Sequence, residues 1–272
     1  MTESVRASNA WTRFWERGGW WRAIILAIAY LALYNLFSLA FLPLAAHVAE
    51  GSASAVVVDY ILPLVIGGLL LIGFALSLGW FGSLFARQTI TGRGWMWIAV
   101  VAVLGFNVLR LFTIDYAAVD FGVVATWLLA GLFIGFAEEL LTRGLVIRLL
   151  RNAGYREITV ALVSAAVFAG LHASNLLTGQ TLAATAFQLV YTFAFGLCMY
   201  LALRVTGNLI WPILLHASTD PTIFLSTAHA VDSPLSAIAG LGNIAVIVAG
   251  FGLVWFIRDD RAGSPSRPVG VR

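Results

Sequence analysis

The feature that most constrains this fold is an apolar run, residues 121–149, which could cross a bilayer yet contains charged side chains. Within it, residues 131–143 read GLFIGFAEELLTR and carry Glu138, Glu139 and Arg143. A charge at mid-bilayer costs about 2.5–3.5 kcal/mol on insertion scales, so such residues face a protein interior or a water-filled cavity. The run therefore predicts a membrane helix whose charged face is covered by other helices.

The composition indicates a membrane protein with many spans. Of the 272 residues, 61% are hydrophobic and 11% are charged, whereas a soluble domain has about 25% charged residues. Gly131 and Gly135 have the spacing of small residues that lets membrane helices pack closely. We expect an all-α transmembrane bundle of about eight spans, each near the ~20 residues that a crossing needs: 23–47, 57–81, 95–114, 121–149, 158–177, 182–203, 208–228 and 237–257.

The basic residues give the expected orientation. All 16 are arginine, and they are concentrated at the termini and in alternate connectors between the expected spans. The positive-inside rule then places both termini in the cytoplasm. Because this charge flanks membrane helices and does not cover a soluble module, the sequence gives no support for nucleic-acid binding. The single cysteine, Cys198, cannot form an internal disulfide.

Two other expected spans carry polar residues at helical spacing. His172 follows Phe168 by four residues, and Asp220 follows His216 by four, so each pair shares one helical face. At about 1.5 Å per residue, Glu138 and these His and Asp residues lie some 12–22 Å from the expected cytoplasmic ends. That depth is near the middle of a ~30 Å hydrocarbon core. We therefore expect three helices to bring these side chains into one site.

The charges of the first motif are expected to have different roles. Arg143 lies four residues after Glu139 and shares its face, so we expect an ion pair between them. This pair would support the site and leave Glu138 free for chemistry. Asp59 and Arg110 lie near the non-cytoplasmic ends of their spans, where side chains can extend to the interface. We expect both to reach the interface outside the site.

A glutamate and two histidines in a wet intramembrane site suit hydrolysis, and two forms of it stay open. In one, Glu138, His172 and His216 hold Zn²⁺, whose bound water has a pKa of about 7. In the other, which needs no metal, Glu138 acts with His172 as general base on water. His216 and Asp220 would then donate to the developing oxyanion, or orient its donor.

Three ordered motifs resemble the signature of the CAAX protease and bacteriocin-processing (CPBP, or Abi) family of intramembrane proteases: Glu138-Glu139-x-x-x-Arg143, Phe168-x-x-x-His172 and His216-x-x-x-Asp220. The span layout is similar to that of the type II CAAX prenyl endopeptidase. The resemblance implies that Glu138 and His172 activate water and that His216 and Asp220 form the oxyanion site. Family members are described both as metalloproteases and as glutamate proteases. Asp220 stands where the prenyl endopeptidase has asparagine, which weakens a simple amide-donor role and favours a metal or a protonated Asp220.

The motifs divide the chain into five expected segments. These are a cytoplasmic arm (1–22), three accessory transmembrane helices (23–120), a catalytic core with the three motifs (121–228), a last transmembrane helix (229–257) and a disordered cytoplasmic tail (258–272). The tail is rich in Gly, Ser, Pro and Arg, a composition typical of disorder.

The leading interpretation is an intramembrane endopeptidase that cleaves membrane-associated or C-terminal segments of protein or peptide substrates. We expect an integral multi-pass protein of a bacterial cell (inner) membrane. The alternative is a non-proteolytic protein of the same fold, either an immunity or chaperone factor or a proton- or metal-coupled transporter, since intramembrane Glu and His sets also form proton relays. The sequence has no inverted repeat of the kind that many transporters contain.

Overall fold

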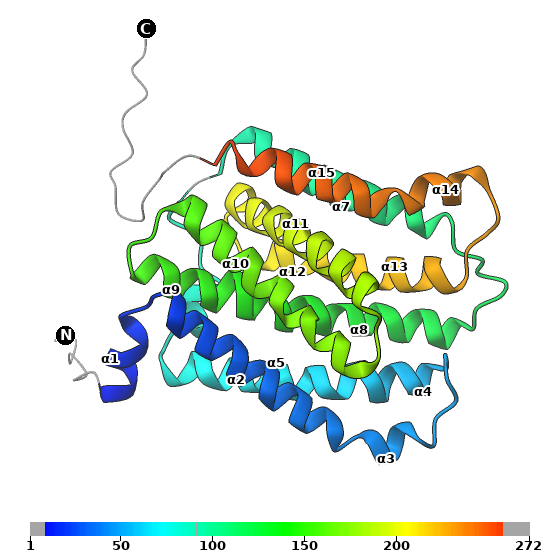
Figure 1. The fold of residues 1–272 in the computed structure, drawn as a ribbon, viewed down its shortest axis with the longest axis horizontal. Helices are drawn as coiled ribbons and strands as arrows, with labels where there is room; N and C mark the ends of the chain where they lie inside the picture. The colour runs from blue at the N-terminus through cyan, green and yellow to red at the C-terminus, as the bar shows by residue number, and fades with distance from the viewer. Residues whose placement is uncertain (1–8, 91, 258–272) are drawn as a thin grey trace, which may run out of the picture.

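The computed structural model describes residues 9–90 and 92–257, which form a bundle of helices (Figure 1). These ranges contain no β-strand, only an isolated bridge between Ile114 and Ala230. The predicted all-α class is therefore confirmed. The predicted disordered tail, 258–272, and residues 1–8 of the predicted arm lie outside the described residues.

The helices follow one another along the chain with short connections. In order they are α1 (Ala10–Glu16), α2 (Trp20–Leu39), α3 (Leu42–Ala45), α4 (Ala53–Val56), the π-helix η1 (Val57–Ile61), α5 (Leu62–Ser77), α6 (Phe81–Leu84), the 3₁₀-helix η2 (Gly94–Met96), α7 (Trp97–Leu111), α8 (Phe121–Glu139), the π-helix η3 (Leu140–Val146), α9 (Ile147–Asn152), α10 (Glu157–Leu171), the 3₁₀-helix η4 (His172–Thr178), α11 (Leu182–Thr206), α12 (Ile210–Ala217), α13 (Thr219–Ala228), α14 (Pro234–Gly240) and α15 (Gly242–Val254).

Seven helical segments of the described chain are long and apolar enough to cross a membrane, and each matches a predicted span: Trp20–Leu39, Ala53–Ser77, Gly94–Leu111, Phe121–Asn152, Glu157–Thr178, Leu182–Thr206 and Pro234–Val254. The remaining predicted span, 208–228, consists of α12 and α13, which are separated at Ser218. When this broken helix is counted as a span, the number of spans is even. In agreement with an even number, α1 and the C-terminal end of α15 lie at the same end of the bundle (Figure 1). Which end faces the cytoplasm stays a prediction, as does the division into five segments.

The bundle exposes many apolar side chains and buries several charged ones. α2 and α5 lie along one side, α7 and α15 lie along the opposite side, and α8 and α10 to α13 lie between them (Figure 1). Outward-facing Val101 and Val248 are each 66% exposed, whereas Glu139 is 0% exposed. Lipid tails solvate exposed apolar side chains, but they cannot solvate a carboxylate. A bilayer therefore accounts for this distribution.

Close packing between α8 and the broken helix depends on two glycines. A Cβ atom at Gly131 would overlap the carbonyl oxygen of Ala217 and the ring of Pro221. At Gly135, a Cβ atom would lie 2.6 Å from the carbonyl oxygen of Ile213. The predicted packing role of this glycine pair is confirmed, and it brings the α8 backbone against the part of α12 and α13 that carries the third motif.

Hydrogen bonds from α7 stabilise the break between α12 and α13. Pro221 has no N–H group, so the backbone carbonyl four residues before it loses its helical donor. At the break, the Nδ2 group of Asn107 donates to Ser218 Oγ (3.0 Å) and Thr219 Oγ1 (2.8 Å). Ser218 and Thr219 lie between the histidine and the aspartate of the third motif, so these bonds fix the relative position of the two.

Arg110 corrects one expectation. Its side chain does not extend to an interface: the residue is 5% exposed, and its guanidinium donates to Asn107 Oδ1 (3.4 Å) and Asn243 Oδ1 (2.9 Å). The amide oxygens of Asn107 and Asn243 thus accept hydrogen bonds from the Arg110 guanidinium inside the bundle, and no sequence pattern had indicated these partners. Asp59 is exposed, as predicted.

Replacing Gly131 by alanine tests the contact between α8 and the broken helix. The added methyl group has no space, and overpacking of this kind costs about 1–3 kcal/mol, so we expect a lower Tm for the protein in detergent micelles. Gly73→Ala in α5 is the matched control, because a Cβ atom there meets nothing within 4 Å. Equal Tm values for the two variants would contradict the proposed contact.

Replacing Asn107 by leucine tests the α7 hydrogen bonds. The change removes donors from two hydroxyl oxygens and an acceptor from Arg110, and leaving buried polar groups unpaired costs about 1–3 kcal/mol. The measurement is thermal unfolding. Asn35→Leu serves as the control, because Asn35 donates only to a carbonyl of its own helix, that of Leu31. If Asn107→Leu destabilised the protein no more than this control, the α7 bonds would not hold the break.

Candidate active site

The first motif lies where α8 passes into the π-helix η3. Glu138 and Glu139 are the last residues of α8, and Thr142 and Arg143 lie in η3. Thr142 Oγ1 donates to the carbonyl oxygen of Glu138 (2.6 Å), and Arg143 Nη1 donates to Thr142 Oγ1. Short π-helical turns inside α-helices are frequent at functional sites, and here the turn follows directly after the two glutamates.

The predicted ion pair between Glu139 and Arg143 is present. Arg143 Nη1 lies 3.1 Å from Glu139 Oε1, and both side chains are 0% exposed. The other guanidinium nitrogen, Nη2, donates to the carbonyl oxygen of Gly196 in α11 (2.8 Å), while Cζ lies 4.6 Å from the centre of the Phe168 ring. The pair therefore connects η3 to α10 and α11.

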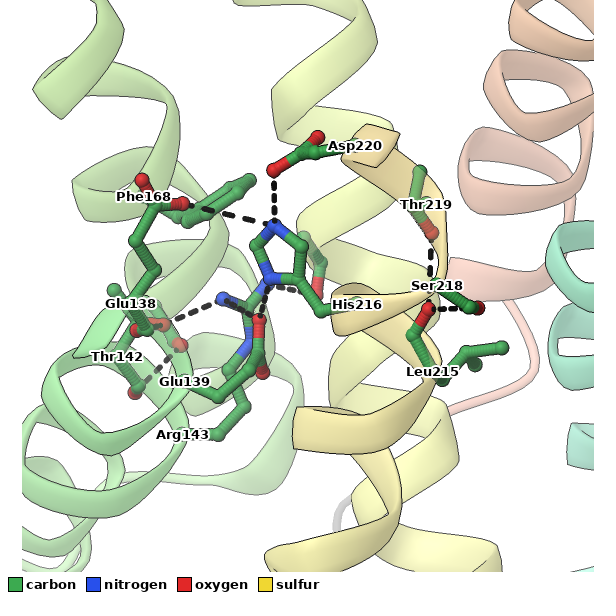
Figure 2. A network of polar contacts seen from close by, with 12 residues as sticks. Glu138, Glu139, Thr142, Arg143, Phe168, Leu215, His216, Ser218, Thr219 and Asp220 are labelled. Carbon is green, nitrogen blue, oxygen red and sulfur yellow. Dashed lines mark hydrogen bonds and ion pairs between the residues drawn. The ribbon is translucent and has the colours of Figure 1, made fainter. Parts of the chain in front are cut away.

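His216 joins the first motif to the third (Figure 2). Its Nδ1 lies 2.8 Å from Glu139 Oε1, and because a carboxylate accepts, Nδ1 carries the proton. Its Nε2 faces two further carboxylates, Asp220 Oδ2 at 3.5 Å and Glu138 Oε2 at 3.7 Å. The sequence predicted the approach of His216 to Asp220, but the bond to Glu139 was missed, because no local pattern reveals the register between α8 and α12.

His172 is held in one orientation by the residue one turn before it. It begins η4, directly after α10 ends at Leu171. Its Nδ1 lies 3.1 Å from the carbonyl oxygen of Phe168, and the two rings meet edge to face with centroids 5.1 Å apart. A carbonyl oxygen can only accept, so Nδ1 carries the proton and Nε2 of the neutral ring is an acceptor.

Three of the predicted residues, Glu138, His172 and Asp220, line one cavity of ≈410 Å³. His216 lies behind this wall and is 2% exposed. Its Nε2 atom is within 4 Å of the carboxylates of Glu138 and Asp220. Among the described residues, Glu138 Oε2 has no hydrogen-bond partner. The four side chains expected to meet therefore do meet, although their chemical roles stay predictions.

The rest of the cavity wall was not predicted. Three tyrosines reach it from the accessory segment: Tyr30, Tyr34 and Tyr60. The wall also contains three amide side chains. Gln188 Oε1 accepts hydrogen bonds from Asn175 (2.8 Å) and Gln180 (3.1 Å). Tyrosines in apolar spans gave a weak sequence signal. The amides gave none, because they lie at or near an expected connector.

The residues proposed as zinc ligands do not fit a metal in this arrangement. Nδ1 of His216 is bonded to Glu139, and its Nε2 lies between two carboxylates. Within residues 9–90 and 92–257, no group of three or more His, Cys, Asp or Glu side chains could hold a metal ion. No step of the chemistry below therefore passes through a metal.

Comparison with known proteins agrees with this geometry. Residues 120–222 match the family model for "Type II CAAX prenyl endopeptidase Rce1-like", whereas no curated protein and no solved structure matches the chain. The matched segment starts at the N-cap of α8, ends within α13 and contains all three motifs. A protease family implies a peptide or protein substrate. Residues 120–222 are therefore similar to the type II CAAX prenyl endopeptidase Rce1-like family over the segment that contains the site.

Proposed function

We propose that this protein is an intramembrane endopeptidase that hydrolyses peptide bonds with a water molecule activated by Glu138 and His172. The observation that carries the proposal is one cavity lined by a carboxylate, an imidazole and a second carboxylate, Asp220, from three separate helical segments. A buried His donor, His216, lies directly behind the two carboxylates. Hydrolysis needs a base for water and a donor for the oxyanion, and the proposal assigns these roles to Glu138 and His216.

Glu138 is the proposed base. Its Oε2 atom is buried 3.7 Å from His216 Nε2 and has no hydrogen-bond partner in the described part of the chain, while the side chain as a whole is 20% exposed and lines the cavity. A water held by this carboxylate would attack the carbonyl carbon of the scissile bond while Glu138 accepts a proton. Transfer of that proton to the amide nitrogen then releases the amine, leaving the other product as a carboxylic acid.

His172 is the proposed partner of Glu138 in holding the water. The bond from its Nδ1 to Phe168 O leaves Nε2 as an acceptor on a residue that lines the cavity. An acceptor at this position can orient one water hydrogen while the carboxylate takes the other. The fixed tautomer is what makes this role available to His172.

His216 is the proposed oxyanion donor. Since Nδ1 already donates to Glu139, this role requires the doubly protonated imidazolium, which the surrounding carboxylates favour; its Nε2–H then faces Asp220 Oδ2, 3.5 Å away. Donors that are already aligned stabilise a developing negative charge most effectively. In this arrangement Asp220 accepts from Nε2–H and orients it, so Asp220 itself needs no proton.

Substrates are proposed to arrive from the bilayer. An apolar groove of ≈480 Å³ runs between α2 and α10, and Leu31 and Leu171 line both this groove and the catalytic cavity. Its outer wall includes the exposed side chains of Trp20 and Ile28. We assign the groove to an apolar segment of a membrane-associated substrate. The location in a bacterial inner membrane, with both termini in the cytoplasm, stays a prediction.

Substitutions at the cavity test the mechanism. We expect Glu138→Gln and His172→Ala to lower kcat on a cleavable peptide by about 10²–10⁴-fold, the usual share of general acid–base catalysis. His216→Ala should lower it by about 10²–10³-fold, as for loss of an oxyanion donor. Asp220→Asn keeps an oxygen that can accept from Nε2–H, so it should retain far more activity than Asp220→Ala. The measurement is cleavage of a peptide library by reconstituted protein.

Glu50→Gln, at an exposed carboxylate, is the control for these variants, and thermal unfolding confirms that each variant is folded. Undiminished cleavage by folded Glu138→Gln and His172→Ala would overturn the mechanism. A wild-type protein that cleaves nothing, with a cellular phenotype that survives Glu138→Gln, would favour the binding-only alternative.

A tryptophan in the groove tests the route of substrate entry. Ala166 is exposed and lines the groove, so Ala166→Trp should raise KM about tenfold for a substrate with a membrane segment and leave kcat nearly unchanged, the pattern of lost uniform binding. KM for a short soluble peptide should not change. Leu162→Trp is the control, because Leu162 is exposed one turn earlier but lines a different surface. Equal effects of both variants on both substrates would exclude the groove as an entry route.

A further inference from the structure

A second polar cavity lies outside the catalytic site, at the end of the bundle where α1 lies. It has a volume of ≈250 Å³ and is formed by η3 and α9 on one side and by α6 with the following connector on the other. We call it the arginine cavity, and its lining residues are Ser83, Leu84, Arg87, Gln88, Thr89, Arg143, Gly144, Ile147, Arg148, Arg151 and Asn152. Four of these are arginines, and none is an aspartate or glutamate.

Two of the four arginines already have carboxylate partners. Arg143 is paired with Glu139 (3.1 Å). Arg151 donates through Nε and Nη2 to the two carboxylate oxygens of Glu157 (2.8 and 2.7 Å), and through Nη1 to Gln88 (2.6 Å). The charge of these two guanidinium groups is therefore balanced within the fold.

The other two carry positive charge that no carboxylate binds. Arg87 is exposed and makes no hydrogen bond or ion pair with any part of the chain that the structure describes. Arg148 donates to Ser83 Oγ and lies with Cζ 4.5 Å over the Trp80 ring, while its Nε atom is buried without a partner. Among the described residues, no carboxylate forms an ion pair with Arg148.

These groups match the chemistry of a phosphate. Guanidinium groups bind phosphate oxygens through paired N–H donors, and Arg87 and Arg148 supply unused donors at one cavity. The hydroxyl group of Thr89 adds a neutral donor to the same wall, whereas the hydroxyl group of Ser83 already donates to the carbonyl oxygen of Trp80 (2.7 Å). No carboxylate in the lining would repel an anion.

The position in the fold indicates a lipid as the source of the phosphate. The arginine cavity lies beside α9, which contacts α1, and Gly19 after α1 donates to the carbonyl oxygen of Leu149 (2.8 Å). α1 and the start of α2 expose aromatic rings, including Trp11 and Trp20. Exposed tryptophans are typical of the membrane–water interface, and basic pockets between membrane helices at that level bind lipid head groups.

We propose that the arginine cavity binds the phosphate of an anionic phospholipid head group, with Arg87 and Arg148 as its ligands. The bound lipid would bridge the α6 connector and α9, the helix that continues the catalytic segment η3. Binding of a ligand to the folded state alone stabilises that state by mass action. The site is thus expected to make the stability of the protein depend on anionic lipid.

The experiment is a thermal unfolding titration of the delipidated full chain in detergent. Phosphatidylglycerol should raise Tm in a saturable way, and phosphatidylcholine should not, because its choline group cancels the charge. Arg87→Gln should weaken the apparent affinity for phosphatidylglycerol about tenfold or more, equivalent to ~1.4 kcal/mol. Arg87 makes no hydrogen bond or ion pair within residues 9–90 and 92–257, so this variant should keep the Tm of the lipid-free protein.

Two further variants make the result specific. Arg17→Gln removes an exposed arginine after α1 that does not line the cavity, and its lipid response should equal that of the wild type. Arg148→Lys keeps the charge and should bind more tightly than Arg148→Gln. Equal losses for Arg87→Gln and Arg17→Gln, or an equal response to phosphatidylcholine, would overturn the proposal. An equal response to inorganic phosphate would overturn the assignment to lipid.

Discussion

One buried carboxylate oxygen organises the site. Glu139 Oε1 accepts from Arg143 Nη1 (3.1 Å) and from His216 Nδ1 (2.8 Å), while the same guanidinium also binds the backbone of α11 at Gly196. Three segments of the chain therefore meet at one ionised group that has no contact with solvent. Loss of one partner from a buried pair costs about 3–5 kcal/mol, because the other charge is left uncompensated. This penalty keeps the imidazole in place before any substrate arrives.

The two adjacent glutamates differ because a helix turns by about 100° per residue. Glu139 points into the bundle with a 0% exposed side chain, whereas the Glu138 side chain is 20% exposed on the cavity wall. Within the described residues, the Oε2 atoms of both carboxylates are buried without a hydrogen-bond partner, and the difference is that Oε1 of the inner one, Glu139, accepts from Arg143 and His216. The difference in environment between these neighbouring glutamates follows from helix geometry, and the proposed division into a structural and a chemical role depends on it.

Local geometry explains which features could be predicted from the sequence. Span lengths, the Glu139–Arg143 pair and the meeting of Glu138, His172, His216 and Asp220 follow from apolar length, i,i+4 spacing and a constant rise per residue. Other features depend on which helices are neighbours and on their register. These are the hydrogen bond between His216 and Glu139, the burial of Arg110, and the hydrogen bonds from Asn107 to the broken helix. No periodicity within one helix encodes those relations, so they required the structure.

The family match covers residues 120–222, yet the cavity is not complete within that segment. Tyr30, Tyr34 and Tyr60 form part of its wall, and the groove that leads to it has α2 as one side. The proposed reacting groups thus come from the matched segment, while the proposed entry surface for a substrate comes partly from the accessory helices. Chains that share the motifs but differ before residue 120 should then perform the same chemistry on different substrates, because the accessory wall selects what enters the cavity.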